Sequence, residues 1–256
     1  MGVLKKNVFG QYVFVKKNVI RIFGALVYPR FNWINRPDIE GAEILQNLPD
    51  KNVLFVSNHQ TYFADVSFFL HIFHAALKGR PNNIRYPGFF FVPKDNIYYV
   101  AAEETMKSGL LPKILALSGA VTVKRTWRAN GKNVKREVDQ KEVEQIDTAL
   151  EDGWVITFPQ GTTTPYVKGR KGTAIIVKKH NPVVVPIVID GFRRAFDKKG
   201  MKLKKKKSKL KVKIKPPIKY SADESAEDIL DKIMDAIEQS PEYDFLEKIK
   251  AKKEEE

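Results

Sequence analysis

The stretch Val53-Leu54-Phe55-Val56-Ser57-Asn58-His59-Gln60-Thr61-Tyr62-Phe63-Ala64-Asp65 decides what fold is expected. It begins with an apolar, β-branched run of strand length, and polar residues follow at once. Asp65 then opens an apolar segment, residues 66–77, that is long enough for a helix. The stretch therefore predicts a strand, a sharp loop that carries His59, and a helix with Asp65 in or just before its first turn.

Two residues six positions apart on one helix would point about 240° apart, so His59 and Asp65 can meet only if His59 lies in the loop. In that geometry the carboxylate accepts a hydrogen bond from one ring nitrogen. The other nitrogen is then a fixed acceptor for a hydroxyl proton, as in an oriented general base. The alternative is an aspartate that caps the helix beside an ordinary loop histidine.

The composition restricts the possible chemistry. The 256 residues, 43% of them apolar, suffice for one large α/β domain or two small ones. The absence of cysteine excludes disulfides, thiolate metal sites and a cysteine nucleophile. Of the four histidines, His71 and His74 lie three apart in an apolar segment with no obvious third ligand, so we expect them in the core or facing lipid. We predict no metal and no cofactor.

The net charge of +15 is concentrated in one segment. Twelve lysines and no acidic residue lie between Lys198 and Lys219, and without these twelve the chain carries +3. Such a patch favours phospholipid headgroups or nucleic acid. We predict no nucleic-acid partner, because the lysine-rich part lacks aromatic residues and a recognition motif. Residues 210–214 alternate perfectly, which predicts a strand with one lysine-covered face that docks a membrane or an acidic carrier, or a protected edge strand.

The first thirty residues predict contact with a membrane. Residues 8–29 are largely apolar, but Lys16, Lys17 and Arg21 interrupt them, and no uncharged run reaches the ~20 residues of a bilayer span. We expect a helix in the membrane interface with snorkelling basic residues, or else an amphipathic helix packed on the domain's own core. No secretory signal pattern is present, so the expected location is the cytosolic face of a membrane, without crossing it.

The remaining elements alternate between strands and helices. We expect strands at 119–125, 154–158 and 183–189, helices at 103–117, 134–150, 170–180 and 222–239, and strand-like or interfacial chain at 88–93 and 97–102. This alternation predicts an α/β fold with a mixed, mostly parallel sheet flanked by helices. The expected division is a membrane-associating segment (1–35), a catalytic domain with the basic strand (36–220), and an acidic helix with a charged tail (221–256).

Four short blocks occur in a fixed order over roughly residues 50 to 190: Asn58-His59 with Asp65, Gly119 to Arg125, Phe158-Pro159-Gln160-Gly161-Thr162, and Val185-Pro186-Ile187. The series resembles the lysophospholipid acyltransferase family, typified by 1-acylglycerol-3-phosphate O-acyltransferase. The resemblance implies that His59 is the general base and that Asp65 polarises it. It implies that Arg125, with Lys124 beside it, holds the acceptor's phosphate. The substrate site would also include Asn58, Phe158, Pro159, Gln160, Gly161 and Thr162.

The resemblance also implies the reaction and the partners. A fatty acyl group would move from an acyl thioester, carried by acyl-carrier protein or coenzyme A, to the free hydroxyl of a lysophospholipid on a membrane surface. The first acceptor to consider is 1-acylglycerol-3-phosphate, which would give phosphatidic acid. Backbone N–H groups near the loop and the helix start would stabilise the oxyanion. The thioester is a co-substrate, so no cofactor is needed.

The sequence departs from the family pattern at three points. Five residues separate His59 from Asp65 where the family usually has four, Gln160 replaces a glutamate, and Thr163 stands where an arginine is common. The lost arginine removes one phosphate-binding cation, for which Lys168, Arg170 or Lys171 can substitute. These departures leave two alternatives open, namely a lyso-aminolipid acceptor without a phosphate monoester and a non-catalytic module that binds membrane lipid.

Overall fold

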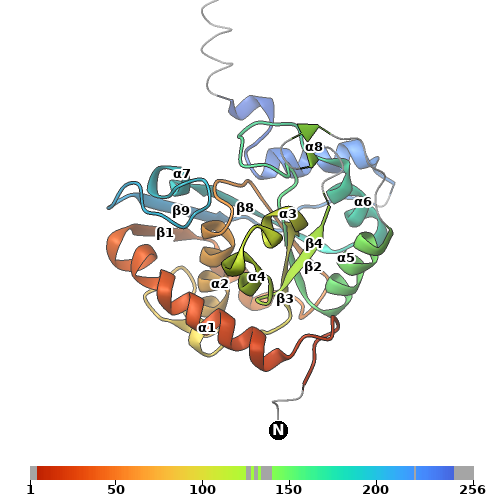
Figure 1. The fold of residues 1–256 in the computed structure, drawn as a ribbon. Helices are drawn as coiled ribbons and strands as arrows, with labels where there is room; N and C mark the ends of the chain where they lie inside the picture. Colours follow the sequence, from red (N-terminus) through yellow and green to blue (C-terminus); the bar gives the residue numbers. More distant parts are fainter. Residues whose placement is uncertain (1–4, 125–127, 130–131, 134–139, 222, 245–256) are drawn as a thin grey trace, which may run out of the picture.

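Seven strands form one sheet with helices on both of its faces (Figure 1). The computed structural model describes residues 5–124, 128–129, 132–133, 140–221 and 223–244. The strands of the sheet are β1 (Arg36–Glu40), β2 (Val53–Ser57), β3 (Ile97–Ala102), β4 (Ala120–Val123), β7 (Trp154–Thr157), β8 (Val183–Asp190) and β9 (Lys209–Ile214). A separate two-stranded ribbon holds β5 (Arg128–Ala129) and β6 (Lys132–Asn133).

The order across the sheet is β1-β9-β8-β2-β7-β3-β4, and every neighbouring pair is parallel except β8 with β9. Parallel strands place their carboxyl ends at one edge of the sheet, where α/β proteins hold their sites. Because β2 lies between β7 and β8, the loop of His59 lies between the loops that follow those two strands. The predicted fold class is confirmed.

The helices connect the strands and cover them. The α-helices are α1 (Val13–Pro29), α2 (Ala64–Ala76), α3 (Glu103–Lys107), α4 (Leu110–Ala116), α5 (Gln140–Asp152), α6 (Lys171–His180), α7 (Phe192–Ala195) and α8 (Ala226–Ala236). Shorter helical turns are η1 (Arg30–Ile34), η2 (Ala42–Asn47), η3 (Gly88–Phe90) and η4 (Pro241–Tyr243).

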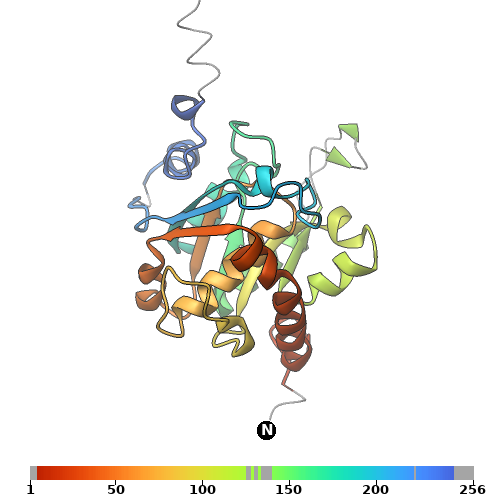
Figure 2. The same ribbon diagram turned by 90° about the vertical axis from the view of Figure 1, so that its left-hand side faces the viewer.

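The alternation of side chains along β2 separates two cores. Val53 and Phe55 point into the larger core, which contains residues of α1, α2 and α4. Leu54 and Val56 point into the second core, against α5, α6 and α8. All four side chains are fully buried, as expected for a central strand of a parallel sheet. Figures 1 and 2 show these two helical layers on opposite sides of the strands.

The prediction that the basic residues of the first helix snorkel is wrong for Lys16. Its side chain is 1% exposed, donates a hydrogen bond to the Ile97 carbonyl at 2.8 Å, and lies 4.1 Å from the centre of the Tyr98 ring. Burial lowers the pKa of Lys16 to about 7, although Asp95 and Asp152 oppose the shift. An acceptor and an aromatic face supplied by a distant strand therefore hold this cation inside.

Helix α1 nevertheless keeps an apolar outer surface. Its inner face packs on the core, as the alternative interpretation of this segment expected, whereas Phe14, Ile22 and Leu26 are 51%, 64% and 66% exposed. Trp33, in the turn that follows, is 75% exposed. Within the part of the chain that the structure describes, no helix has the length and apolar character needed to cross a bilayer. Binding at a membrane surface stays a prediction.

Two local predictions change. The helix expected over 103–117 is broken into α3 and α4, and Gly109 between them is extended, with φ 169°. Pro112 explains the break, because a residue without an N–H is tolerated in the first turn of α4 but not in the middle of one long helix. The segment 88–93 forms the turn η3 rather than a strand, since Gly88 packs closely on the backbone at the end of α2.

The lysine-faced strand β9 is an inner strand, so its interpretation as an edge strand is wrong. It lies between β1 and β8, and its exposure alternates as predicted, with Leu210, Val212 and Ile214 buried. The helix expected over 134–150 is present as α5, and residues 134–139 lie outside the described residues. The proposed division of the chain into three parts stays a prediction.

Candidate active site

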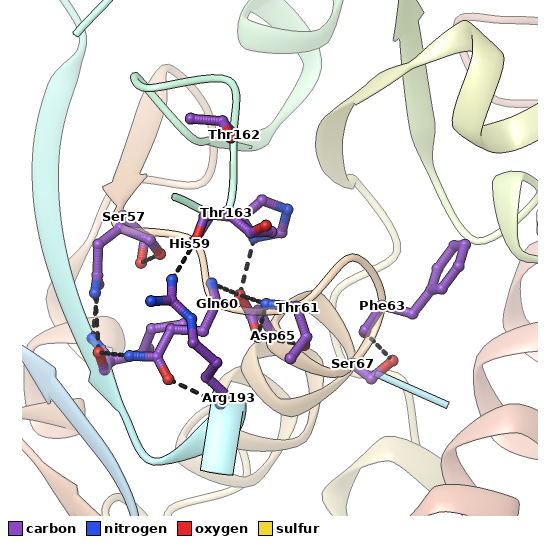
Figure 3. A network of polar contacts seen from close by, with 12 residues as sticks. Ser57, His59, Gln60, Thr61, Phe63, Asp65, Ser67, Thr162, Thr163 and Arg193 are labelled. Atoms are coloured by element: carbon purple, nitrogen blue, oxygen red, sulfur yellow. Dashed lines mark hydrogen bonds and ion pairs between the residues drawn. The ribbon is translucent and has the colours of Figure 1, made fainter. Parts of the chain in front are cut away.

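His59 and Asp65 meet in the way that the loop position of His59 allows (Figure 3). The histidine follows β2 by two residues, and Asp65 is the second residue of α2. The Nδ1 atom of His59 lies 2.8 Å from Oδ2 of Asp65. The predicted contact is therefore confirmed, and the extra residue in the loop is accommodated. Because Nδ1 is engaged, the opposite ring nitrogen, Nε2, is the one left to act on a substrate.

Asp65 is fully buried and is held by the loop that it closes. Its carboxylate accepts hydrogen bonds from the backbone N–H of Gln60 at 2.7 Å, from the N–H of Thr61 at 3.0 Å, and from the Thr61 hydroxyl at 2.6 Å. A buried carboxylate with several donors is fixed in place, so it can orient the imidazole of His59. Thr61 was not singled out from the sequence, although a threonine four residues before the aspartate is a local signal.

The same bonds occupy the N–H groups on which the sequence-based hypothesis relied for an oxyanion hole. Gln60 and Thr61 donate to Asp65, and Tyr62 and Phe63 donate to the carbonyls of residues 198 and 199 at 3.1 and 3.0 Å. These four groups are therefore not available to a reaction intermediate. The loop after β7 also borders the site, through Pro159, Gly161 and Thr162.

Two side chains fix the His59 loop against its neighbours. Asn58 donates to the Ile189 carbonyl at 2.9 Å and accepts from the Ile189 N–H at 2.8 Å, so it ties the loop to β8. The ring of Phe158, at the end of β7, stacks on the imidazole of His59 with 3.9 Å between centroids and 25° between planes. Asn58 is thus a support of the site rather than part of the apolar cavity described below.

Gln160 points away from that cavity as well. It is buried, and its Nε2 donates to the Val167 carbonyl at 3.0 Å and to Oε1 of Gln239 at 3.2 Å. The same Oε1 accepts from the N–H of Tyr166 at 3.0 Å. A glutamate at position 160 could not donate to these oxygens, which explains why glutamine replaces it here. Sequence reasoning missed Gln239, and the unusual Gln160 was the only signal for it.

The apolar cavity beside His59 has a volume of about 220 Å³. Pro159, Gly161 and Thr162 of the predicted block line it, together with His59, Phe158, side chains of β3 and α3, and the first residues of α6. Tyr62, Val66 and Tyr99 line both this cavity and a smaller one of about 40 Å³ between α1, α2 and α4. The site thus continues as an apolar path toward the outer helices.

A polar cleft of about 680 Å³ opens on the other side of His59. Asn58 and Gln60 line it together with charged residues of β1, β8 and β9 and with the end of the segment that follows α8. His59 lines both spaces, so its imidazole stands where an apolar and a polar compartment meet.

The predicted phosphate-binding cations are only partly in view. Lys124 is exposed, and its backbone N–H bonds with Glu142 at 2.9 Å, but Lys124 does not line the apolar cavity. Arg125 lies outside the described residues. Arg170, just before α6, does line the cavity. Of the three cations predicted to replace the missing arginine, Arg170 is therefore the one that the fold brings to the site.

No metal site emerges within the described ranges, where no three His, Cys, Asp or Glu side chains gather. His71 and His74 lie in the core, as one of the two expectations held, and burial lowers their pKa values to about 3 and about 4. The predicted absence of a cofactor stays a prediction.

Comparison with known proteins places this site in a family. No curated protein matches the sequence. The model of the acyltransferase family matches residues 36–190. Among solved structures, the crystal structure of the 1-acyl-sn-glycerophosphate (LPA) acyltransferase PlsC from Thermotoga maritima is similar, with a TM-score of 0.55 and 18% sequence identity. The match covers 94% of this chain and 80% of that one, and at this identity it shows a shared fold. Because the family model spans more than half of the sequence, the chain belongs to the acyltransferase family and is an acyltransferase.

Proposed function

We propose that this enzyme transfers a fatty acyl group from a thioester to the free hydroxyl of a lysolipid, with His59 as the general base. The observation that supports the proposal most is the placement of His59. Its Nδ1 is held by a fully buried carboxylate at 2.8 Å, and its ring borders both an apolar and a polar compartment. A base at such a boundary can take the proton of an acceptor hydroxyl on the polar side while the acyl chain of the thioester occupies the apolar side.

In the proposed reaction, Nε2 of His59 takes the proton of the acceptor hydroxyl as the oxygen attacks the thioester carbonyl carbon. Asp65 stabilises the imidazolium that forms and keeps the ring in one orientation. The carbon–sulfur bond then breaks, and the thiolate leaves with the proton from the imidazolium. The products are an ester and a free thiol, and no acyl-enzyme is required. We assign oxyanion binding to the loop after β7, where Thr162 lines the apolar cavity.

The apolar cavity is the proposed place for the acyl chain of the thioester. Its extension ends between α1 and α4, which both carry exposed apolar side chains on the outside of the molecule. Leu110 of α4 is 77% exposed, and Ile22 and Leu26 of α1 are exposed to a similar degree. We propose that this surface lies in one leaflet of a membrane, so that lipid substrates enter without crossing water.

The test uses the full-length protein, mixed micelles of a lysolipid, and an acyl thioester of either acyl-carrier protein or coenzyme A. We expect free thiol and diacyl product in equal amounts, with product identified by mass spectrometry. The acceptor set should include 1-acylglycerol-3-phosphate and lysolipids with other head groups. Binding to lipid vesicles with no product from any donor and acceptor would contradict the proposal and favour a non-catalytic lipid-binding module.

A further inference from the structure

The polar cleft beside His59 is built by the unusual position of β9. This strand inserts between β1 and β8, parallel to the first and antiparallel to the second. Its apolar residues enter the larger core, so its lysines face the opposite side of the sheet. The second core, under α5, α6 and α8, contains residues of β2, β3, β4, β7 and β8 but none of β1 or β9. The charged face of β1 and β9 is therefore left open as the floor of the cleft.

The strand register arranges charges in rows across this floor. Lys211 pairs in register with Asp38 of β1 on one side and with Asp190 of β8 on the other. In the next row, Lys213 stands opposite Glu40 of β1. All of these side chains line the cleft. Charged side chains directly opposite each other on neighbouring strands interact, so a structural role in sheet pairing is the competing explanation.

Several of the carboxylates already have cationic partners at the rim. Asp38 binds Lys209 at 2.8 Å, Asp190 binds Arg194 at 2.7 Å, and a third pair links Glu238 with Lys215 at 2.9 Å. None of these rim cations lines the cleft itself.

Among the described residues that line the cleft, Glu40, Lys211 and Lys213 enter no ion pair within 4.0 Å. Arg193 also lines the cleft, and its guanidinium donates to the Thr163 carbonyl. The cleft therefore offers free cations and a free carboxylate together.

The charged rows lie directly beside the base. Asp190 follows Ile189, whose backbone is held on both sides by Asn58, the neighbour of His59. Gln60 reaches from the His59 loop to the Ile189 carbonyl at 3.1 Å and accepts from the Arg193 N–H at 3.1 Å (Figure 3). A head group bound over these rows of charge would therefore lie close to the substrate hydroxyl on which His59 acts.

We propose that this cleft binds the head group of the acceptor lipid, and that the head group carries both an acidic group and an amino group. The inference rests on the proposed acyl transfer to a lysolipid. Lys211 and Lys213 would bind the acidic group, and Glu40 would bind the ammonium. Glu40, the carboxylate of the cleft that no cation neutralises among the described residues, disfavours the alternative occupant, the polyphosphate portion of coenzyme A, because like charges repel.

The experiment compares two acceptors that share a phosphodiester and an acyl chain but differ in the amino group: lysophosphatidylethanolamine and lysophosphatidylglycerol. A third acceptor, a hydroxyacyl amide of a diamino acid, presents a carboxylate and an ammonium without phosphate. We expect kcat/KM to favour the acceptors with an ammonium by about tenfold. Glu40→Gln should remove this preference, Lys213→Gln should raise KM for all three acceptors, and Glu144→Gln, an exposed control on α5, should change nothing.

Three results would overturn the inference. Equal or better use of lysophosphatidylglycerol or 1-acylglycerol-3-phosphate by the unaltered enzyme would leave acyl transfer intact but reject the amino group. If Glu40→Gln changed stability but not the preference among acceptors, the rows of charge would serve only to pair the strands of the sheet. A higher KM for acyl-coenzyme A alone would assign the cleft to the donor. If no acceptor were acylated with any donor, the proposed function itself would fail, and this inference with it.

Discussion

Two histidine–aspartate pairs lie among the described residues, and they share a short distance and an equal histidine exposure but differ in their surroundings. His59 and Asp65 approach to 2.8 Å, and His180 and Asp147 to 2.6 Å, while both imidazole side chains are 12% exposed. Asp65 is fully buried and held by neutral donors, whereas Asp147 is shared with the cation of Lys179. Burial acts to raise the pKa of Asp147, but the hydrogen bonds from Lys179 and His180 hold it below its usual value.

The orientation of the two rings also differs. His59 uses Nδ1 for its aspartate and so presents Nε2 to the two compartments. His180 uses Nε2 for Asp147, which leaves only the atom nearer its own backbone. The comparison shows that a short contact does not make a general base. The free nitrogen must face a space that a substrate can enter, and the carboxylate must be reserved for the ring.

The largest effect expected from this comparison concerns the two carboxylates. Asp65→Asn should lower kcat by about a hundredfold or more, because the ring of His59 would no longer be held in the reactive tautomer. Asp147→Asn should leave kcat unchanged and cost about 1 kcal/mol of stability at most, as for other pairs near the surface. Steady-state rates and thermal unfolding of both variants provide the measurement. Equal losses of kcat would mean that the two pairs are equivalent.

A smaller effect on the enzyme is expected from the loop after β7, which is held in place by the contact between Gln160 and Gln239. Gln239→Ala would remove one of the two acceptors of the Gln160 Nε2, which keeps the Val167 carbonyl, and would leave the N–H of Tyr166 without its partner, at a total cost of about 1–2 kcal/mol. Because this loop lines the apolar cavity proposed for the acyl chain of the thioester, KM for the thioester should rise together with the loss of stability. Gln239→Glu keeps the accepting oxygen and should restore both values.

Gln46→Ala is the matched control for that prediction. Its side chain donates a single hydrogen bond to the Ala76 carbonyl at 2.9 Å, away from the cavity. It should lower stability without changing KM. A Gln239→Ala enzyme with reduced stability and an unaltered KM would show that Gln239 only supports the fold.

Both histidine–aspartate pairs are partly buried, whereas Lys16 places a single titratable group deep in the protein, and its effect on stability is testable. Its pKa of about 7 lies below the ordinary value of 10.5, so between these pH values the unfolded chain holds the proton and the folded protein does not. Stability should therefore rise with pH above 7, by up to about 1.4 kcal/mol per pH unit from this group. Chemical denaturation from pH 7 to 9 should show this rise, and Lys16→Met should flatten it. Parallel curves for the two proteins would contradict the assignment.

The last prediction tests the outer surface through a pair of matched apolar positions. Ile22 and Leu26 of α1 lie on the surface proposed to face lipid, whereas Ile175 of α6 is 55% exposed on the opposite layer. Ile22→Glu with Leu26→Glu should weaken sedimentation with phospholipid vesicles, and Ile175→Glu should not. The effect on kcat with a micellar acceptor should be small. If the unaltered protein and both variants bound vesicles equally, the proposal that α1 contacts the membrane would be wrong.

Local pattern was enough to predict the loop of His59. The apolar run of β2, the polar loop and the helix with Asp65 follow one another, so geometry along a short segment determined their contact. Gln239 could not be predicted, because it lies 79 residues from Gln160 and carries no local signature. The same limit applies to Lys16, since the acceptor and ring that keep it buried belong to β3.

The polar cleft shows the limit for the sheet. The alternation within β9 was visible in the sequence, but its place between β1 and β8 depends on strand order, which no local pattern encodes. An edge strand and an inner strand with one open face have the same alternation. The residues of a substrate site were implied by the family blocks, whereas the rows of charge across three strands became visible only with the fold.

The most direct test of the central claim measures acyl transfer by His59→Ala and His180→Ala side by side, with thiol release and ester formation followed in the same reaction. Both variants remove an imidazole of equal exposure from an aspartate at a similar distance. We predict that His59→Ala loses at least about a hundredfold in kcat with its circular dichroism unchanged, and that His180→Ala retains the full rate. Near-normal turnover by folded His59→Ala would contradict the account.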